Sequence, residues 1–372
     1  MSQVKVTDQR IYLPGLNGLR AIAAITVMFS HMFEPSFANW GIIPIKLPLF
    51  TGGVTLFFVI SGFLITYLLL QEYSKAETIQ VKKFYVRRIL RIWPIYYAYI
   101  LISIIVLYFA GLSDEILNAR LWFYVFFTAN IPFLSSSGIW ILVHYWSIGV
   151  EEQFYLFWPL VVKFSKKKLL RTVMTIMILW LCFKYGSWII FSNKSLVYRF
   201  FAVTSFQSMM IGATGAILFF RKNKLFLRLL TKNYVQILTW CFFLGNGFFI
   251  EYIPAIIRNE IVAAFSLILI IGQVENKLKY LSLENKIFDF IGKISYGIYV
   301  IHPLVIFLGS ILWRRYVSGV NLTSEYFIIY IGVCCATVLL AWLSYNYFER
   351  PFLRIKDKYA VVKSGNSSNS KM

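Results

Sequence analysis

The chain has 372 residues, of which 59% are hydrophobic, 19% aromatic and only 14% charged. A soluble domain could not bury that much apolar surface, so the composition indicates a membrane protein that crosses the bilayer several times. The formal net charge of +21 would suggest nucleic acid binding in a soluble protein. Here the basic residues cluster in short segments between hydrophobic runs, where they act as topology signals, and no nucleic acid partner is expected.

Ten hydrophobic runs of membrane-spanning length follow one another along the chain. Lysine and arginine concentrate after every second run, so all the basic clusters fall on one side if both termini are cytoplasmic. The sequence therefore predicts an all-α integral membrane bundle of about ten transmembrane helices with cytoplasmic termini. The runs lie at about 16–33, 49–71, 90–111, 146–164, 170–191, 197–220, 235–253, 258–275, 294–313 and 326–348.

The apolar stretch 121–134 lies inside a long loop, 112–145, on the external face. Counting it as an eleventh span would put a lysine cluster on the wrong side, so we expect an interfacial or re-entrant segment. We expect one membrane domain over 1–353 and a disordered cytoplasmic tail over 354–372, because the chain has no linker and ends in a Ser/Asn-rich segment. The four cysteines show no metal-ligand spacing and are expected to be free thiols.

Arg20 and His31 stand eleven residues apart in the first run, in a chain with only three histidines. Eleven residues return to within roughly 20° of the same helix face, about 16 Å along the axis. Ionisable residues in a spanning helix are costly and usually face the protein interior, so the pair is a candidate catalytic site. The alternative makes each an independent anchor near one membrane face.

The fourth run opens with the segment His144-Tyr-Trp-Ser-Ile-Gly-Val-Glu-Glu-Gln-Phe-Tyr. Its carboxylates, Glu151 and Glu152, suit a helix N-terminus on electrostatic grounds alone. Tyr155 follows Glu151 by four residues, however, which extends a polar stripe into the protein interior. A histidine supported by a carboxylate is sufficient for general-base chemistry, so we expect Glu151 or Glu152 to support His31.

Three further basic residues, Arg87, Arg88 and Arg91, share a sector at the start of the third run. Such a cluster suits a phosphorylated ligand, although topology alone would also supply it. His302 precedes Pro303 in the middle of a predicted helix. It is as consistent with a core histidine as with a catalytic one, and no metal site is expected.

Taken together, these segments resemble the acyltransferase family 3 membrane proteins, which include bacterial O-antigen, exopolysaccharide and peptidoglycan O-acetyltransferases. The resemblance covers about residues 12–353 and rests on five ordered motifs. These are the Arg20–His31 spacing with Leu16-Asn-Gly-Leu-Arg-Ala, Phe57-Phe-Val-Ile-Ser-Gly-Phe, Arg87-Arg-Ile-Leu-Arg-Ile, Trp146-Ser-Ile-Gly-Val-Glu-Glu-Gln-Phe-Tyr, and Tyr347-Phe-Glu-Arg-Pro.

The resemblance implies that Arg20 and His31 serve acetyl-CoA use and acyl transfer, and that the three-arginine motif engages the donor from the cytoplasm. It also implies a shared cavity, with Ser61, His144, Trp146, Ser147 and Tyr155 as expected lining residues. This sequence departs from the family pattern at two positions: the family often has Asp where Asn17 stands and an acidic residue where Thr55 stands. These departures bear on the preference for the acceptor and on the charge inside the cavity.

The expected function is acyl transfer in the bacterial inner membrane, from cytoplasmic acetyl-CoA or another acyl-CoA to a hydroxyl of a cell-surface or lipid-linked glycan. Some relatives carry an additional esterase-like domain, whereas this sequence stops about twenty residues after its last predicted helix. We therefore expect direct transfer or a separate extracytoplasmic transfer protein as a partner, beside membrane lipids. A transporter or flippase of a lipid-linked glycan is the alternative, since buried polar groups and broken helices also occur there.

Overall fold

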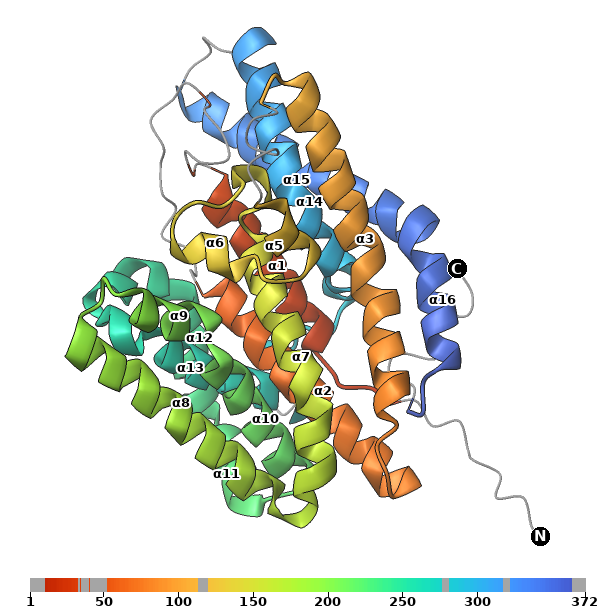
Figure 1. The fold of residues 1–372 in the computed structure, drawn as a ribbon, viewed down its shortest axis with the longest axis vertical. Helices are drawn as coiled ribbons and strands as arrows, with labels where there is room; N and C mark the ends of the chain where they lie inside the picture. The colour runs from red at the N-terminus through yellow and green to blue at the C-terminus, as the bar shows by residue number, and fades with distance from the viewer. Residues whose placement is uncertain are drawn as a thin grey trace.

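The computed structural model describes residues 11–32, 34, 40, 52–112, 120–275, 281–316 and 322–362. Within these ranges the chain is built from helices and contains no strand (Figure 1). The main helices are α1 (Leu16–His31), α2 (Gly53–Ala76), α3 (Val81–Phe109), α7 (Tyr145–Ser165), α8 (Leu169–Phe191), α9 (Leu196–Thr204), α10 (Phe206–Phe220), α11 (Lys224–Leu230), α12 (Asn233–Phe249), α13 (Ala255–Glu275), α14 (Lys286–Tyr316), α15 (Leu322–Leu343) and α16 (Arg350–Lys358).

Seven helical segments of the described chain are long and apolar enough to cross a membrane, against the ten predicted. Each predicted run contains a helix, and the difference arises from helix length. With 16 and 17 residues, α1 and α12 are shorter than the roughly 20 residues that a bilayer core requires. The segment Tyr145–Phe191 also joins α7 and α8, which the sequence counts as two runs. The cytoplasmic placement of the termini stays a prediction.

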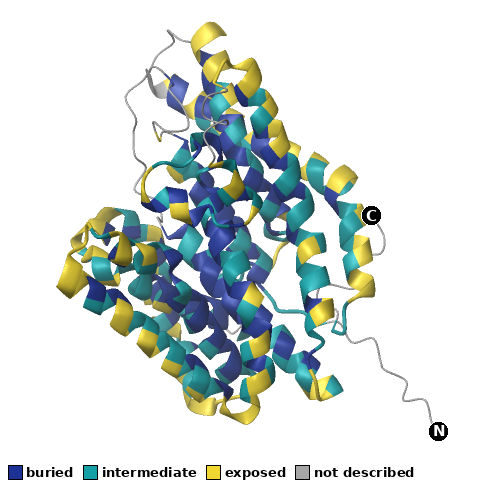
Figure 2. Ribbon diagram, viewed as in Figure 1, coloured by how far each residue is buried: buried dark blue, intermediate teal, exposed yellow. Residues whose placement is uncertain are grey.

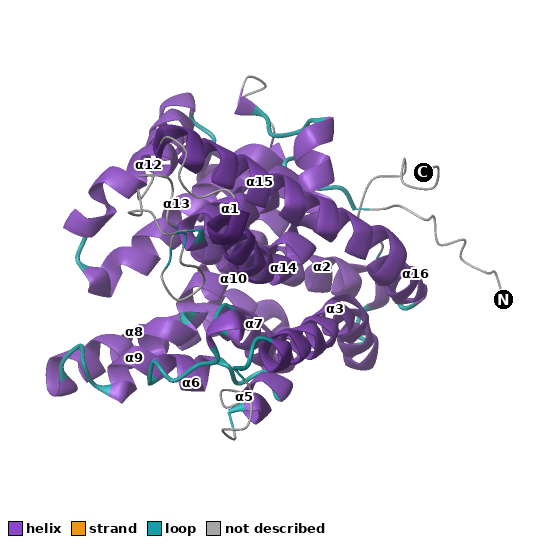
Figure 3. Ribbon diagram, turned by 90° about the horizontal axis from the view of Figure 1, so that it is seen from above, coloured by secondary structure: helices purple, strands orange, loops and turns teal. Residues whose placement is uncertain are grey.

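The helices pack around a centre formed by α1, α2 and α14. The first of these, α1, packs against both α2 and α14, while α14 also packs against α15, and α10 packs against α2, α8 and α13. Seen from above, α1, α10 and α14 lie near the middle of the molecule, with α8 and α9 on one side and α3 and α16 on the other (Figure 3).

The crossing of α2 and α10 depends on two glycines. A Cβ atom on Gly62 would lie 1.9 Å from the carbonyl oxygen of Met209, and one on Gly212 would lie 2.1 Å from that of Val59. Only glycine allows the two backbones to approach this closely, which is typical of helix pairs in membranes. The crossing fixes the position of Ser61, the residue before Gly62.

The loop that follows α3 contains two short helices, α5 (Leu121–Val125) and α6 (Asn130–Leu134). Five residues are too few to span a bilayer, so this stretch is not an additional transmembrane helix. Tyrosines of α3 hold the loop against the bundle: Tyr96 Oη donates to Tyr124 O at 2.6 Å, and Tyr97 Oη donates to Val125 O at 2.9 Å.

The periphery of the bundle is apolar. Large hydrophobic side chains are exposed along several helices, including Leu101 of α3, Phe183 of α8 and Leu244 of α12. Buried residues gather along the middle of the bundle (Figure 2). An apolar exterior of this extent fits lipid rather than water as the surrounding medium. All four cysteines are free thiols, as predicted.

A buried ion pair joins α8 to α13. Lys184, which is 1% exposed, places its Nζ 2.6 Å from Glu260 Oε1 and donates to Ile256 O at 2.6 Å. Gln207 of α10 donates to the same carboxylate oxygen at 3.0 Å. A charged pair within an apolar bundle is stable only when both partners are present, so we assign it to helix packing.

A π-helical turn, η5 (Ser344–Glu349), connects α15 to α16. Glu349 is 8% exposed and accepts a hydrogen bond from Ser344 Oγ at 3.1 Å. The predicted tail from residue 354 begins inside α16, which is helical to Lys358 and packs against α3. The Ser/Asn-rich end, residues 363–372, lies outside the described residues.

Candidate functional site

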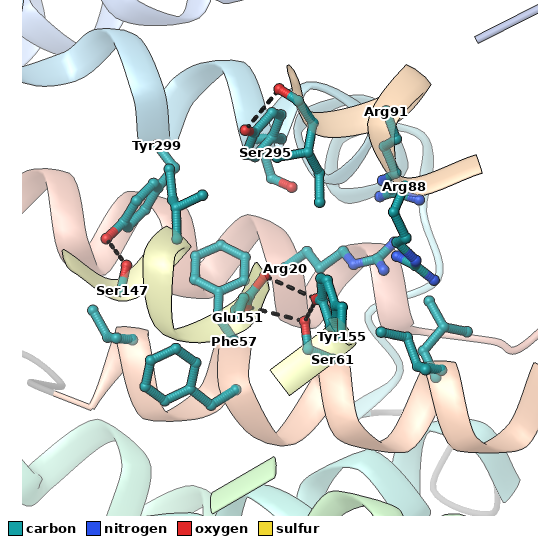
Figure 4. A pocket seen from close by; sticks show the side chains of 17 residues that line it. Arg20, Phe57, Ser61, Arg88, Arg91, Ser147, Glu151, Tyr155, Ser295 and Tyr299 are labelled. Carbon is teal, nitrogen blue, oxygen red and sulfur yellow. Dashed lines mark hydrogen bonds between the residues drawn. The ribbon is translucent and has the colours of Figure 1, made fainter. Parts of the chain in front are cut away.

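A cavity of about 90 Å³ lies at the centre of the bundle, between α1, α2, α3, α7 and α14. Its lining combines apolar side chains with a small number of charged and hydroxyl groups, the composition expected of a binding site (Figure 4). The polar lining residues are Arg20, Ser61, Arg88, Arg91, Ser147, Glu151, Tyr155, Ser295, Tyr296 and Tyr299.

One side of the cavity is basic. Arg20 comes from α1, and Arg88 and Arg91 come from the first half of α3. The three guanidinium side chains lie together in Figure 4. Arg88 also lies over the ring of Tyr155, 5.1 Å from its centroid. Cations within an apolar bundle need opposite charge or strong acceptors nearby, and such groups are candidate binding residues.

The negative charge at the cavity belongs to Glu151 of α7, which side chains of α2 and α7 hold in place. Ser61 Oγ donates to Glu151 Oε1 at 3.0 Å, and Tyr155 Oη donates to Glu151 Oε2 at 2.9 Å. The two hydroxyl oxygens lie 2.8 Å apart, so two hydroxyl protons are shared among three contacts. Tyr155 follows Glu151 by one helical turn of α7, and Ser61 meets both from α2.

Among the described residues, His31 and its two expected carboxylate partners, Glu151 and Glu152, bond to other groups. Glu151 is bonded to Ser61 and Tyr155, on the side of the cavity that Arg20 lines. Arg20 and His31 are about 16 Å apart along α1, so a carboxylate beside one does not reach the other. Glu152 lies outside the cavity lining, and its Oε2 accepts from Trp93 Nε1 at 3.4 Å.

His31 instead contacts another histidine. Its Nδ1 lies 2.9 Å from His302 Nε2, and the two rings are nearly parallel, with an interplanar angle of 13°. The ring of His144 lies 5.5 Å from that of His302. All three histidines of the chain therefore form one cluster, although they come from α1, the residue before α7, and α14.

Tyr299 connects the cavity to this histidine cluster. It lines the cavity on the side away from the arginines, together with Ser147 (Figure 4). Its Oη lies 2.5 Å from Ser147 Oγ and donates to His144 O at 3.0 Å. Its ring lies 5.9 Å from that of His302. The cavity thus runs from three guanidinium groups to a tyrosine that contacts the buried histidines.

Besides His31 and Glu152, three further sequence-predicted site residues lie away from the cavity lining. Arg87 forms an ion pair with Glu72 at 3.2 Å and donates to Tyr359 O at 3.0 Å. Arg87 and Arg88 are adjacent on the helix and point about 100° apart, so they serve different partners. His144 belongs to the histidine cluster, and Trp146 stacks on Phe133 at 5.0 Å between ring centroids.

A second cavity, of about 220 Å³, adjoins the first at Arg20, Arg91 and Tyr296, which line both. It extends toward the start of α1, and its lining contains both basic and acidic side chains. The charged lining residues are Arg20, Arg91, Glu284, Asp289, Lys293, Glu349 and Lys356. Beside it, Tyr12 donates to Glu284 Oε1 at 2.5 Å, and burial together with this bond raises the pKa of Tyr12.

A comparison with models of known protein families identifies the family of this chain. The family model described as an acyltransferase domain matches residues 13–346, nearly the whole chain. The chain belongs to the acyltransferase 3 family. The resemblance expected from the five motifs is thereby confirmed.

Two named relatives of this acyltransferase 3 protein are peptidoglycan O-acetyltransferase OatA of Listeria monocytogenes and O-acetyltransferase OatA of Staphylococcus aureus. The first is 32% identical over 92% of this chain and 56% of the relative, and the second is 27% identical over 91% and 57%. The chain thus spans a little over half the length of these relatives. No solved structure matches it.

Residues that the sequence did not select are also part of the site. The sequence analysis assigns no role to His302 and does not select Tyr299 or Tyr296. Their signal was present in Ile294-Ser-Tyr-Gly-Ile-Tyr-Val-Ile-His, where Tyr299 and His302 are three residues apart on one face of a helix. Within the described chain, no group of three His, Cys, Asp or Glu side chains is arranged to hold a metal ion.

Proposed function

We propose that this chain is an integral-membrane O-acyltransferase. It moves an acetyl or other short acyl group from cytoplasmic acyl-CoA to a hydroxyl of a cell-surface or lipid-linked glycan, in the bacterial inner membrane. One observation carries the proposal: a single cavity has three guanidinium groups on one side and, on the other, a tyrosine that contacts a buried cluster of histidines. Membership of the acyltransferase 3 family and the names of the two relatives support it.

The basic side of the cavity suits the donor. Coenzyme A is a phosphorylated thiol carrier, and guanidinium groups bind phosphate oxygens through paired hydrogen bonds. Arg88 and Arg91 would bind the donor phosphates where the two cavities meet, and Arg20 would hold the donor further along its arm, with the thioester end extending toward His31. Glu151 would keep the guanidinium groups in place through the charge it presents to the cavity. The larger, mixed-charge cavity beside them leaves room for the rest of a long donor molecule.

The histidine side of the cavity suits the transfer step. As a general base, His31 would take the proton of the acceptor hydroxyl while that oxygen bonds to the acyl carbon. The carbon–sulfur bond then breaks, and the departing thiolate receives the proton from His31. Donor and acceptor would approach from opposite faces, because Arg20 and His31 lie about 16 Å apart along α1. A separate extracytoplasmic protein would serve as the acceptor of the acyl group if transfer to the glycan is indirect.

The test is thioester turnover by the purified full chain in lipid vesicles, with acetyl-CoA as donor and peptidoglycan fragments as acceptor. We expect His31→Ala to lower CoA release on the order of 10²- to 10⁴-fold, the usual contribution of a general base. A cysteine variant far from the cavity, Cys241→Ser, is the control, because Cys241 is exposed on α12.

Near-normal turnover in His31→Ala would refute the proposed mechanism. If the wild type releases no CoA but moves a lipid-linked glycan across the vesicle membrane, a transporter is favoured instead. Size-exclusion profiles in detergent establish that each variant is folded before turnover is compared.

A further inference from the structure

We propose that His302 is a positioning residue that fixes the tautomer of His31 and leaves the lone pair of His31 on Nε2. The inference rests on the proposed function for its consequence, since it explains how His31 is prepared to accept a proton. It assigns a role to a histidine for which the sequence offered only alternatives.

The first step concerns the protons of His302 itself. His302 is fully buried in α14, and its Nδ1 lies 3.1 Å from the carbonyl oxygen of Ile298. A carbonyl oxygen only accepts, so Nδ1 carries the hydrogen. Among the described residues, the titratable side chains against this ring are His31, His144 and Tyr299, and none of the three supplies a negative charge at neutral pH. A buried cation without an opposite charge is costly, so His302 is neutral and its Nε2 bears a lone pair.

The second step transfers this constraint to His31. The lone pair of His302 Nε2 faces His31 Nδ1 across 2.9 Å. A hydrogen bond at that distance requires a donor, so His31 carries its hydrogen on Nδ1. In neutral imidazole the other nitrogen then holds the lone pair, and only a nitrogen with a lone pair accepts a proton or attacks an acyl carbon. The chain of bonds from Ile298 through His302 thus selects the reactive nitrogen of His31.

The third step is the rigidity of the arrangement. Ile298 and Val300 present neighbouring carbonyl groups on α14, and each is bonded by a histidine: Ile298 O by His302, and Val300 O by His144 Nε2 at 3.2 Å. Both anchors are buried and belong to one helical turn. His302 therefore has a fixed orientation, as residues that hydrogen-bond to functional histidines commonly do.

The arrangement also acts during transfer. When His31 Nε2 takes the hydroxyl proton, the ring becomes a cation and its Nδ1–H bond to His302 becomes charge-assisted and stronger. His302 keeps its own hydrogen on Nδ1, bonded to Ile298, so no proton passes beyond His31. When the thiolate leaves, His31 returns the proton to sulfur and both rings regain their starting tautomers.

Two substitutions separate orientation from packing. In His302→Gln the side-chain Oε1 offers an acceptor to His31 Nδ1, whereas in His302→Leu a side chain of comparable size offers none. We expect His302→Leu to lower kcat roughly 10- to 100-fold, the range typical for loss of a histidine-orienting partner, with the KM for acetyl-CoA unchanged. His302→Gln should retain more of the turnover. A residue that only fills space would give the opposite ranking or equal losses.

A direct measurement is nuclear magnetic resonance of the full chain in lipid nanodiscs with isotopically labelled histidine nitrogens. The chain has only three histidines, so the imidazole signals are few and are assigned by single substitutions. In the wild type we expect His31 to be protonated on Nδ1. In His302→Leu we expect His31 to be protonated on Nε2 or to exchange between the two tautomers. Protonation on Nε2 in the wild type, or an unchanged His31 signal in His302→Leu, would overturn the inference.

The two proposals fail separately. If His31→Ala keeps its turnover, the proposed function fails whatever the tautomer of His31. If His31→Ala is inactive while His302→Leu matches the wild type in both turnover and His31 tautomer, only the role of His302 fails.

Discussion

The glycine crossing of α2 and α10 leads to a quantitative prediction for Gly62→Ala. The new Cβ would stand 1.9 Å from Met209 O, and an ordinary contact begins at 3.4 Å, so the two helices must separate by about 1.5 Å. Overpacking of a close contact costs typically 1–3 kcal/mol, and a shift of two backbones belongs at the upper end. Alanine returns roughly 0.5–1 kcal/mol through its better helix propensity. We therefore expect a net destabilisation of about 2 kcal/mol.

The assay is thermal unfolding in detergent, with Gly186→Ala as the matched control. Gly186 also lies within a helix, α8, but a Cβ there would meet nothing within 4 Å. The same substitution should therefore stabilise the protein slightly at this position, by about 0.5–1 kcal/mol. Because Gly62 follows Ser61, the displaced α2 should also weaken the hydrogen bond from Ser61 to Glu151 and lower turnover.

Equal unfolding midpoints for Gly62→Ala and Gly186→Ala would refute the close approach of α2 and α10. The double variant Gly62→Ala with Gly212→Ala provides a further check, because both glycines serve the same crossing. Once one Cβ has pushed the helices apart, the second enters space already opened. The combined loss should therefore be smaller than the sum of the single losses.

Three further outcomes are expected. Arg91→Gln should weaken acetyl-CoA binding by about 1.5–3 kcal/mol in titration calorimetry, whereas Arg87→Gln should leave that affinity intact and lower the unfolding midpoint, because its buried carboxylate partner loses its ion pair. Glu151→Gln should lower turnover roughly 10- to 100-fold and Glu152→Gln much less, since only the first lines the cavity; the reverse ranking in kcat would contradict the assigned helix face. Lys184→Met should cost about 3–5 kcal/mol of stability by leaving a buried carboxylate unpaired, and an unchanged melting curve would show that the pair is not formed.

The helices could be predicted from hydropathy because each spanning segment must satisfy its backbone groups internally, which leaves a continuous apolar run in the sequence. Their number could not, because the length of a helix depends on tertiary context. The run 197–220 illustrates this point: the chain breaks at Ser205, which has a left-handed φ of 42°, and gives α9 and α10. No glycine marks that break in the sequence.

The site could be predicted only where its residues share a helix. The alignment of Glu151 with Tyr155 follows from helical periodicity, and the structure has both at the cavity. The partner of His31 could not be read in this way, since His302 lies 271 residues further along the chain. A carboxylate was the reasonable expectation for a histidine partner, yet the packing of α1 against α14 brings another imidazole there instead.

The π turn at Ser344–Glu349 sets the rotational phase of everything that follows it. Tyr345 and Glu349 of the π turn and Leu353 and Lys356 of α16 all line the second cavity, so one face of the chain continues from the turn into α16. The wider turn shifts the angular position of every later residue relative to an unbroken α-helix. Deleting one residue there, such as Asn346, would rotate α16 by about 100° while leaving the apolar length of α15 unchanged. Such a chain would still reach the membrane, yet its cavity would lose one carboxylate and one ammonium group at once.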